Sequence, residues 1–130
     1  MRAARWAVTV ALLPVAVMAA PAQAVKPIPV TTITLDQAAP AFQDTVTFTT
    51  TGTEKMRNPR IILVCYQGDD LVYGENGALD YGFILGGYSS PWTMLGGGPA
   101  DCTATIADYV WKGKWQVGYS GASIAFHVTD

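Results

Sequence analysis

Charged side chains are scarce in this chain of 130 residues, where they make up 14% of the sequence. Eight basic residues stand against ten acidic ones, and the isoelectric point is near 5.1. This balance provides no basic stripe to neutralise phosphates, so it argues against a nucleic-acid binder. The high share of hydrophobic residues, 50%, together with the low share of charged ones argues against intrinsic disorder. The length allows one ordinary domain and leaves little room for a second.

The sequence also lacks an apolar run long enough to span a bilayer. Its densest apolar segment, 6–20, follows two arginines and precedes an A-x-A site that ends at Ala24. This run is shorter than the roughly 20 residues of a spanning helix, which favours a cleaved, helical signal peptide over residues 1–24 against a membrane anchor. We therefore expect a secreted, extracellular protein with no membrane span after leader cleavage. A proline-containing linker, 25–30, should lead into a single domain, 31–130.

Only two cysteines are present, and both lie in the part expected to be exported. In an oxidising compartment, Cys65 and Cys102 most simply form one disulfide. The alternatives are two buried thiols or a metal pair. Two thiolates without a second CxxC or nearby histidines do not complete a zinc site.

Helical periodicity is missing after the leader, whereas short alternating segments recur. In residues 44–51, for example, apolar Val46 and Phe48 alternate with threonines, as is typical of a half-buried strand. Glycine-rich 74–77 and 118–121 are expected to be turns, and 86–99 a loop with a short extended piece at 92–95. The expected strands are 31–35, 44–51, 60–67, 71–73, 81–85, 101–110 and 123–129. About seven short strands in 100 residues predict an all-β, antiparallel β-sandwich.

Three segments carry a family resemblance: Thr45 to Phe48, Leu63 to Tyr66, and Ala100 to Ala104. With them the chain resembles a bacterial immunoglobulin-like β-sandwich domain, and it is similar to small secreted actinobacterial proteins of unknown role. The usual pattern has a tyrosine two residues before the second cysteine, where this chain has Ala100. The first cysteine falls in the third expected strand, so the disulfide should join that strand to the penultimate one.

Groups for catalysis are few. The one histidine of the chain, His127, would need a serine and a carboxylate nearby to act in a hydrolase. Gly118 to Gly121 lacks the second spacer of a nucleophile elbow and the helix that should follow. The acidic residues of 69–80 could hold calcium but do not match its loop pattern. We therefore predict no enzyme, with no catalytic residue, metal ligand or cofactor.

Strand parity gives the functional hypothesis. If Cys65 faces the core, Ile62, Val64 and Tyr66 face outward; if Cys102 does, Tyr109 and Trp111 face outward. An exposed apolar face usually marks an interaction site. The alternative is that the glycine-rich segment 86–99 covers this face as a lid.

Aromatic residues and lysines gather in 109–115, at the expected last hairpin. We predict a secreted, non-enzymatic binding module that meets a protein, cell-wall or carbohydrate partner outside the cell. One alternative is a carbohydrate- or cell-wall-binding domain, which exposure of both indoles on one flat face would favour and burial of both would exclude; another is a small secreted hydrolase. The expected contact residues are Tyr109, Trp111 and Trp115, with Tyr66 and Trp92 as weaker candidates.

Overall fold

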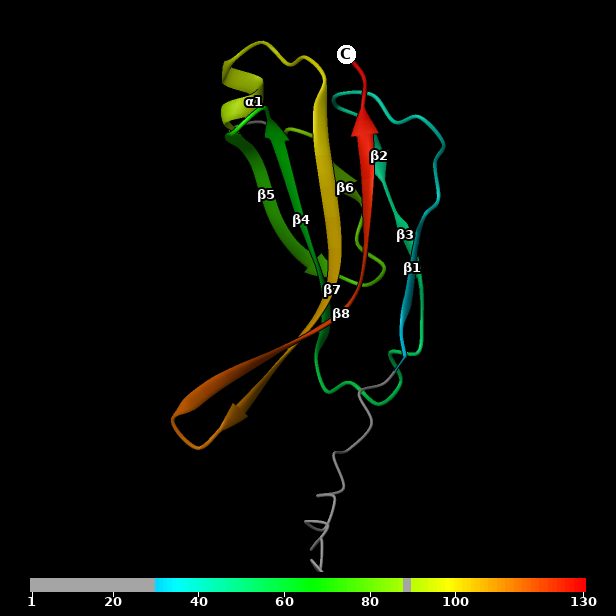
Figure 1. Ribbon diagram of the computed structural model, residues 1–130, viewed down its shortest axis with the longest axis vertical. Coiled ribbons are helices and arrows are strands. Elements are labelled where there is room, and N and C mark those ends of the chain that lie inside the picture. The colour runs from blue at the N-terminus through cyan, green and yellow to red at the C-terminus, as the bar shows by residue number, and fades with distance from the viewer. Residues whose placement is uncertain (1–29, 88–89) are drawn as a thin grey trace, which may run out of the picture.

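The computed structural model describes residues 30–87 and 90–130 of the chain (Figure 1). The expected signal peptide and most of the expected linker lie outside these residues. The described chain is all-β apart from one helical turn, with antiparallel sheets and one disulfide. Its elements are β1 (Thr32–Leu35), β2 (Thr45–Val46), β3 (Phe48–Thr51), β4 (Pro59–Gln67), β5 (Asp70–Ala78), β6 (Phe83–Ile84), α1 (Pro91–Met94), β7 (Ala100–Lys112) and β8 (Trp115–Val128).

The main sheet has four strands in the order β5-β4-β7-β8. Along β4, the fully buried Ile61, Leu63 and Cys65 alternate with more exposed residues, and Tyr66 on the outer face is 42% exposed. This period of two is what a sheet with one buried face requires. The parity predicted for β4 is therefore confirmed.

A second layer of short strands covers the inner face of this sheet. β1 pairs with β3, and β2 pairs with β6. From this layer Val46, Phe48 and Phe83 enter the core, where the Phe48 and Phe83 rings pack edge to face with centroids 5.8 Å apart. Burial of these aromatic side chains is a major stabilising term.

The expected strand 44–51 is divided at Thr47. The carbonyl of Thr47 accepts a hydrogen bond from the Asp36 N–H (3.1 Å), and the Thr47 hydroxyl donates to the Asp36 carboxylate (2.7 Å). Thr49 also donates to this carboxylate (2.5 Å). These two hydroxyl hydrogen bonds lower the pKa of Asp36, that from Thr49 more than that from Thr47. The chain can thus pass from β2 to β3, which pair with different partners.

Three local expectations were wrong. The predicted extended piece 92–95 is helical: Ser90 caps the turn by accepting from the Thr93 N–H (3.3 Å), and Pro91 starts it. Residues 74–77, expected to turn, continue β5, and 118–121, also expected to turn, lie within β8. At Gly77 a side chain would collide with the rings of Tyr81 and Phe83, so this glycine serves close packing within a strand.

The disulfide predicted between Cys65 and Cys102 is confirmed. The two residues are directly opposite one another on the neighbouring strands β4 and β7, with Cα atoms 4.0 Å apart. As predicted, it ties the strand of Cys65 to the penultimate strand. It joins two strands of one sheet, whereas the usual immunoglobulin disulfide joins two sheets.

In the part of the chain that the structure describes, no helix is long and apolar enough to cross a membrane.

Candidate functional site

A hairpin formed by the ends of β7 and β8 extends beyond the main sheet (Figure 1, orange). β4 pairs with β7 only as far as Asp108, so residues 109–119, here called the arm, form a two-stranded ribbon. A two-residue turn, Gly113-Lys114, closes it. Gly113 has φ +62°, the left-handed conformation that suits glycine at the first position of a type II′ turn.

The base of the arm is fixed to the body by a buried carboxylate. Asp108 is 6% exposed and accepts hydrogen bonds from the backbone N–H groups of Arg57 (3.1 Å) and Asn58 (2.8 Å). These bonds compensate the carboxylate for the water that it loses on burial. The arm therefore begins at a defined anchor.

A β-bulge in β8 lies next to this base. Thr105 pairs with Ser123 and Ala107 with Ser120, so Gly121 and Ala122 together stand opposite one residue of β7. The Ala122 N–H is satisfied by the Thr31 hydroxyl (2.7 Å). A bulge bends a strand and increases its twist, which explains why the arm bends away from the plane of the main sheet.

Two tryptophans of the arm are among the most exposed large side chains of the described chain. Trp111 is 66% exposed and Trp115 is 79% exposed. Trp111 pairs with Gln116, whereas Trp115 pairs with Lys112, the next residue along β7. Since paired residues share a face and successive residues alternate, the two indoles lie on opposite faces of the ribbon.

Two tyrosines lie further down the ribbon. Tyr119 shares the face of Trp115, and it was missed because 118–121 was expected to be a turn. Tyr109 is half-buried, and its ring lies over Gly118, where a Cβ atom would come within 3.0 Å of it. The arm thus presents aromatic rings on both faces.

All charges within the arm are positive. Lys112 and Lys114 are exposed at the tip, and residues 109–119 contain no Asp or Glu. The Lys112 ammonium lies 5.7 Å from the ring centre of Tyr119, within cation–π range. The sequence predicted this combination of aromatics and lysines at a hairpin.

The two weaker candidates lie elsewhere. Trp92 is fully buried against Phe42 and Tyr73, and its indole N–H donates to the Gly98 carbonyl (2.9 Å). It anchors its loop to the core and is not part of an exposed surface. Tyr66 is on the outer face but stands opposite Asp101, eight residues along β7 from Tyr109 and hence about 27 Å away.

In the described part of segment 86–99, Trp92 is buried against Phe42 and Tyr73 on the inner side of the main sheet, so it does not cover the outer face as a lid would. On the outer face, Thr103 and Ala125 are exposed, and Ile62 and Val64 are half-buried. This face is more polar than the predicted apolar patch. The large apolar side chains exposed on this face are Tyr66 (42%) and Leu71 (53%), whereas the arm exposes Trp111 (66%), Trp115 (79%) and Tyr119 (42%).

His127 forms a hydrogen bond with Asp101 on this outer face, with Nδ1 and Oδ1 2.8 Å apart. Both side chains are more than half exposed. Ser123 shares the face but lies four residues back along β8, about 13 Å away by strand geometry. This serine is therefore outside the reach that the hydrolase alternative requires.

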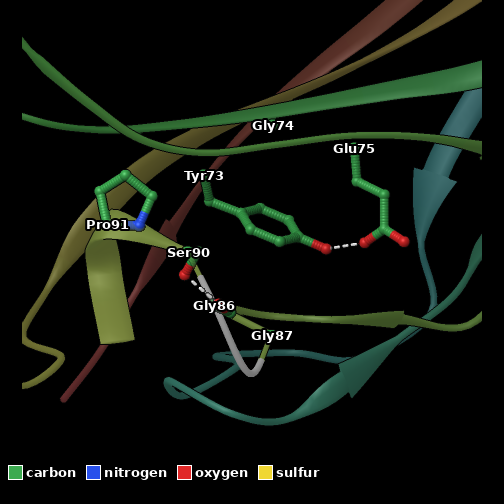
Figure 2. Close-up of a pocket in the computed structure, with 7 residues that line it drawn as sticks. All are labelled: Tyr73, Gly74, Glu75, Gly86, Gly87, Ser90 and Pro91. Carbon is green, nitrogen blue, oxygen red and sulfur yellow. Dashed lines mark hydrogen bonds between the residues drawn. The ribbon is translucent and has the colours of Figure 1, made fainter. Parts of the chain in front are cut away.

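An open cleft of about 390 Å³ lies where β5 faces the loop before α1 (Figure 2). Its lining residues are Tyr73, Gly74, Glu75, Gly86, Gly87, Ser90 and Pro91. The Tyr73 hydroxyl donates to the Glu75 carboxylate, as does that of Tyr81 (2.8 Å). Burial and the carboxylate raise the pKa of Tyr73, and the carboxylate raises that of Tyr81. The cleft thus contains a carboxylate each of whose oxygens accepts a hydrogen bond from a tyrosine hydroxyl.

Among residues 30–87 and 90–130, no three or more His, Cys, Asp or Glu side chains come together as metal ligands would. Comparison with protein-family models, with curated proteins and with solved structures finds no match for this chain.

Proposed function

We propose that this protein is an exported, non-enzymatic binding module whose contact surface is the arm. The observation that carries the proposal is the exposure of Trp111 and Trp115 on a ribbon that extends away from the body. Large aromatic side chains provide much contact area at low cost in conformational entropy. A two-stranded ribbon is also marginally stable in water by itself, so a partner would stabilise the arm while binding it.

We also propose that the domain is an immunoglobulin-like β-sandwich. Two layers of antiparallel strands support a divergent immunoglobulin-like sandwich. The disulfide within one sheet and the fragmentation of the second layer into two strand pairs are the departures from that pattern. Export is supported by the disulfide, which persists in oxidising compartments.

The carbohydrate alternative is less well supported than the general binding role. A sugar ring that stacks on two indoles needs both of them on one flat face. The register of the arm places Trp111 and Trp115 on opposite faces, although both are exposed. This arrangement favours a partner that surrounds the ribbon.

The test is a pull-down with the exported protein against the cell envelope and the culture medium of the cells that make it. The double variant Trp111→Ala/Trp115→Ala should lose capture of whatever the wild type retains, because about 1.5–3 kcal/mol of apolar burial is removed at each site. Circular dichroism should show that the variant remains folded, because both side chains lie outside the core.

The matched control is Met94→Ala/Leu95→Ala. These residues are 81% and 67% exposed, so the change removes similar apolar exposure from a different part of the surface. Capture should be retained. Equal capture by the wild type and the tryptophan variant would refute the arm as the contact surface.

A further inference from the structure

We propose that the partner of the arm is the surface of an anionic lipid bilayer, with the tip inserted at the level of the headgroups. This inference rests on the proposed function and names the partner for the same surface. Three properties of the arm support it: aromatics on both faces, positive charge without negative charge, and projection from the body.

The first property is the placement of the indoles. Trp111 and Trp115 are exposed on opposite faces of the ribbon, so a flat protein surface could cover only one of them. A lipid layer closes around an inserted object and can contact both. The interface is also where tryptophan and tyrosine concentrate in membrane proteins, because their rings are apolar and carry a polar atom.

The second property is charge. Lys112 and Lys114 flank and occupy the turn, and the segment 109–129 contains no acidic residue. All ten acidic residues of the chain therefore lie outside it. An anionic surface would attract the tip and repel most of the body, so the protein would approach with the arm first.

The third property is reach. From Asp108 to the turn, β7 runs four further residues, which is about 14 Å in a strand. Interfacial segments typically insert 5–10 Å into the headgroup boundary, so the tip can do so while the body stays in water. The backbone edges of a two-stranded ribbon need hydrogen-bonding partners, which the hydrocarbon core does not provide. The depth is therefore limited to the hydrated headgroup layer.

The experiment measures binding of the exported protein to vesicles by co-sedimentation and by tryptophan fluorescence. One set of vesicles contains phosphatidylglycerol and phosphatidylcholine in equal parts, and the other contains phosphatidylcholine alone. The wild type should bind the anionic vesicles with a blue shift of its emission. Bromine atoms placed near the headgroups should quench this emission more than bromine at the chain ends.

Two variants separate the contributions. Trp111→Ala/Trp115→Ala should weaken binding at least tenfold, the effect expected from losing burial of large apolar side chains. Lys112→Gln/Lys114→Gln should weaken binding to anionic vesicles about fivefold per lysine and leave the weak binding to phosphatidylcholine unchanged. Met94→Ala/Leu95→Ala, the control remote from the arm, should bind as the wild type does. Any contribution of residues 25–29 is common to all four proteins.

Several outcomes would overturn the lipid proposal. They are equal binding by the wild type and the tryptophan variant, equal binding to both vesicle types, and strongest quenching from the chain ends. If vesicles fail to bind while lipid-extracted envelope still captures the wild type but not the tryptophan variant, the partner is a protein or wall polymer. The proposed function then stands without lipid. If neither material is captured through the arm, both proposals fail.

Discussion

At the scale of single residues, Glu75 is the group whose surroundings have the clearest consequence for pH dependence. It accepts hydrogen bonds from the hydroxyls of Tyr73 and Tyr81. Burial and then the hydrogen bond and charge of Glu75 raise the pKa of Tyr73 above its ordinary value of 10, and the hydrogen bond and charge of Glu75 raise that of Tyr81. Above pH 10 the unfolded chain loses these protons before the folded protein does. The free energy of unfolding must then fall as pH rises.

We predict that Tyr73→Phe makes this alkaline loss shallower. The variant should be less stable than the wild type at neutral pH, by about 1–3 kcal/mol for a hydrogen bond to a charged group, and the difference should narrow between pH 10 and 12. Urea unfolding at a series of pH values measures both effects. Tyr66→Phe, on the exposed outer face, is the control and should follow the wild-type curve. A constant difference at every pH would contradict the assignment.

Gly77 and Gly74 are a matched pair in β5 that tests the packing on its inner face. A Cβ atom on Gly77 would lie 2.7 Å from the Tyr81 ring and 2.9 Å from that of Phe83, whereas one on Gly74 meets nothing within 4 Å. We predict that Gly77→Ala destabilises the protein by about 1–3 kcal/mol through overpacking. Gly74→Ala should be within about 0.5 kcal/mol of the wild type. Thermal unfolding of the two variants measures the stability that each loses. Similar losses in both would contradict the steric argument.

At the scale of elements, the arm and the body should differ in local stability although they share β7 and β8. Up to Asp108, β7 is paired on both sides, with β4 and with β8; beyond it, only β8 remains. We predict that amide hydrogens of 109–119 exchange with solvent faster than those of 101–107. Local opening of the ribbon exposes no core side chain and is therefore less costly. Hydrogen exchange followed by mass spectrometry measures this, and equal protection would mean that the arm is as rigid as the sheet.

Sequence patterns predicted the interior of the main sheet better than its ends. Residues 60–67 are apolar on both sides, but the strand period of two, counted from an inward-facing Cys65, predicted the more buried and more exposed faces of β4 correctly. The glycines of 74–77 indicated a turn, yet Gly77 lies in a strand, where two rings pack over it. What keeps this segment in a strand is its pairing with β4, where Ile61 stands opposite Gly77, and the glycines themselves give no local signal of that pairing.

The composition of the arm was predicted from the sequence, but the faces on which its side chains lie were not. The gathering of aromatics and lysines in 109–115 is visible in the sequence. The bulge at Gly121 and Ala122 is not visible, and it reverses the parity of β8 between the body and the tip. Whether Trp111 and Trp115 share a face therefore had to come from the pairing register. Trp92, with no alternation around it, gave no indication that it is buried.

At the scale of the whole molecule, the small share of charged residues acquires meaning from its distribution. Two of the eight basic residues lie at the tip of the arm, and no acidic residue lies between Asp108 and Asp130. A net charge of −2 conceals this separation between an acidic body and a basic tip. The overall composition argued against phosphate recognition by the molecule as a whole. It gave no information about the positive electrostatic potential at the tip of the arm.

The stability of the whole domain should depend strongly on the disulfide, since the core of a chain of this size is small. Cys65 and Cys102 close a loop with a sequence separation of 37, for which loop-closure entropy gives about 4 kcal/mol. We predict that reduction of the wild type lowers the free energy of unfolding by about that amount, and that Cys65→Ala/Cys102→Ala lowers it further. Both half-cystines are buried, so part of the variant's loss reflects missing contacts, which the reduced wild type keeps. Urea unfolding of the oxidised wild type, the reduced wild type and the variant separates the loop-closure contribution from that of the lost contacts.

A reduced protein as stable as the oxidised one would contradict this prediction. It would show that the β4–β7 pairing holds the two halves of the domain together without the covalent link.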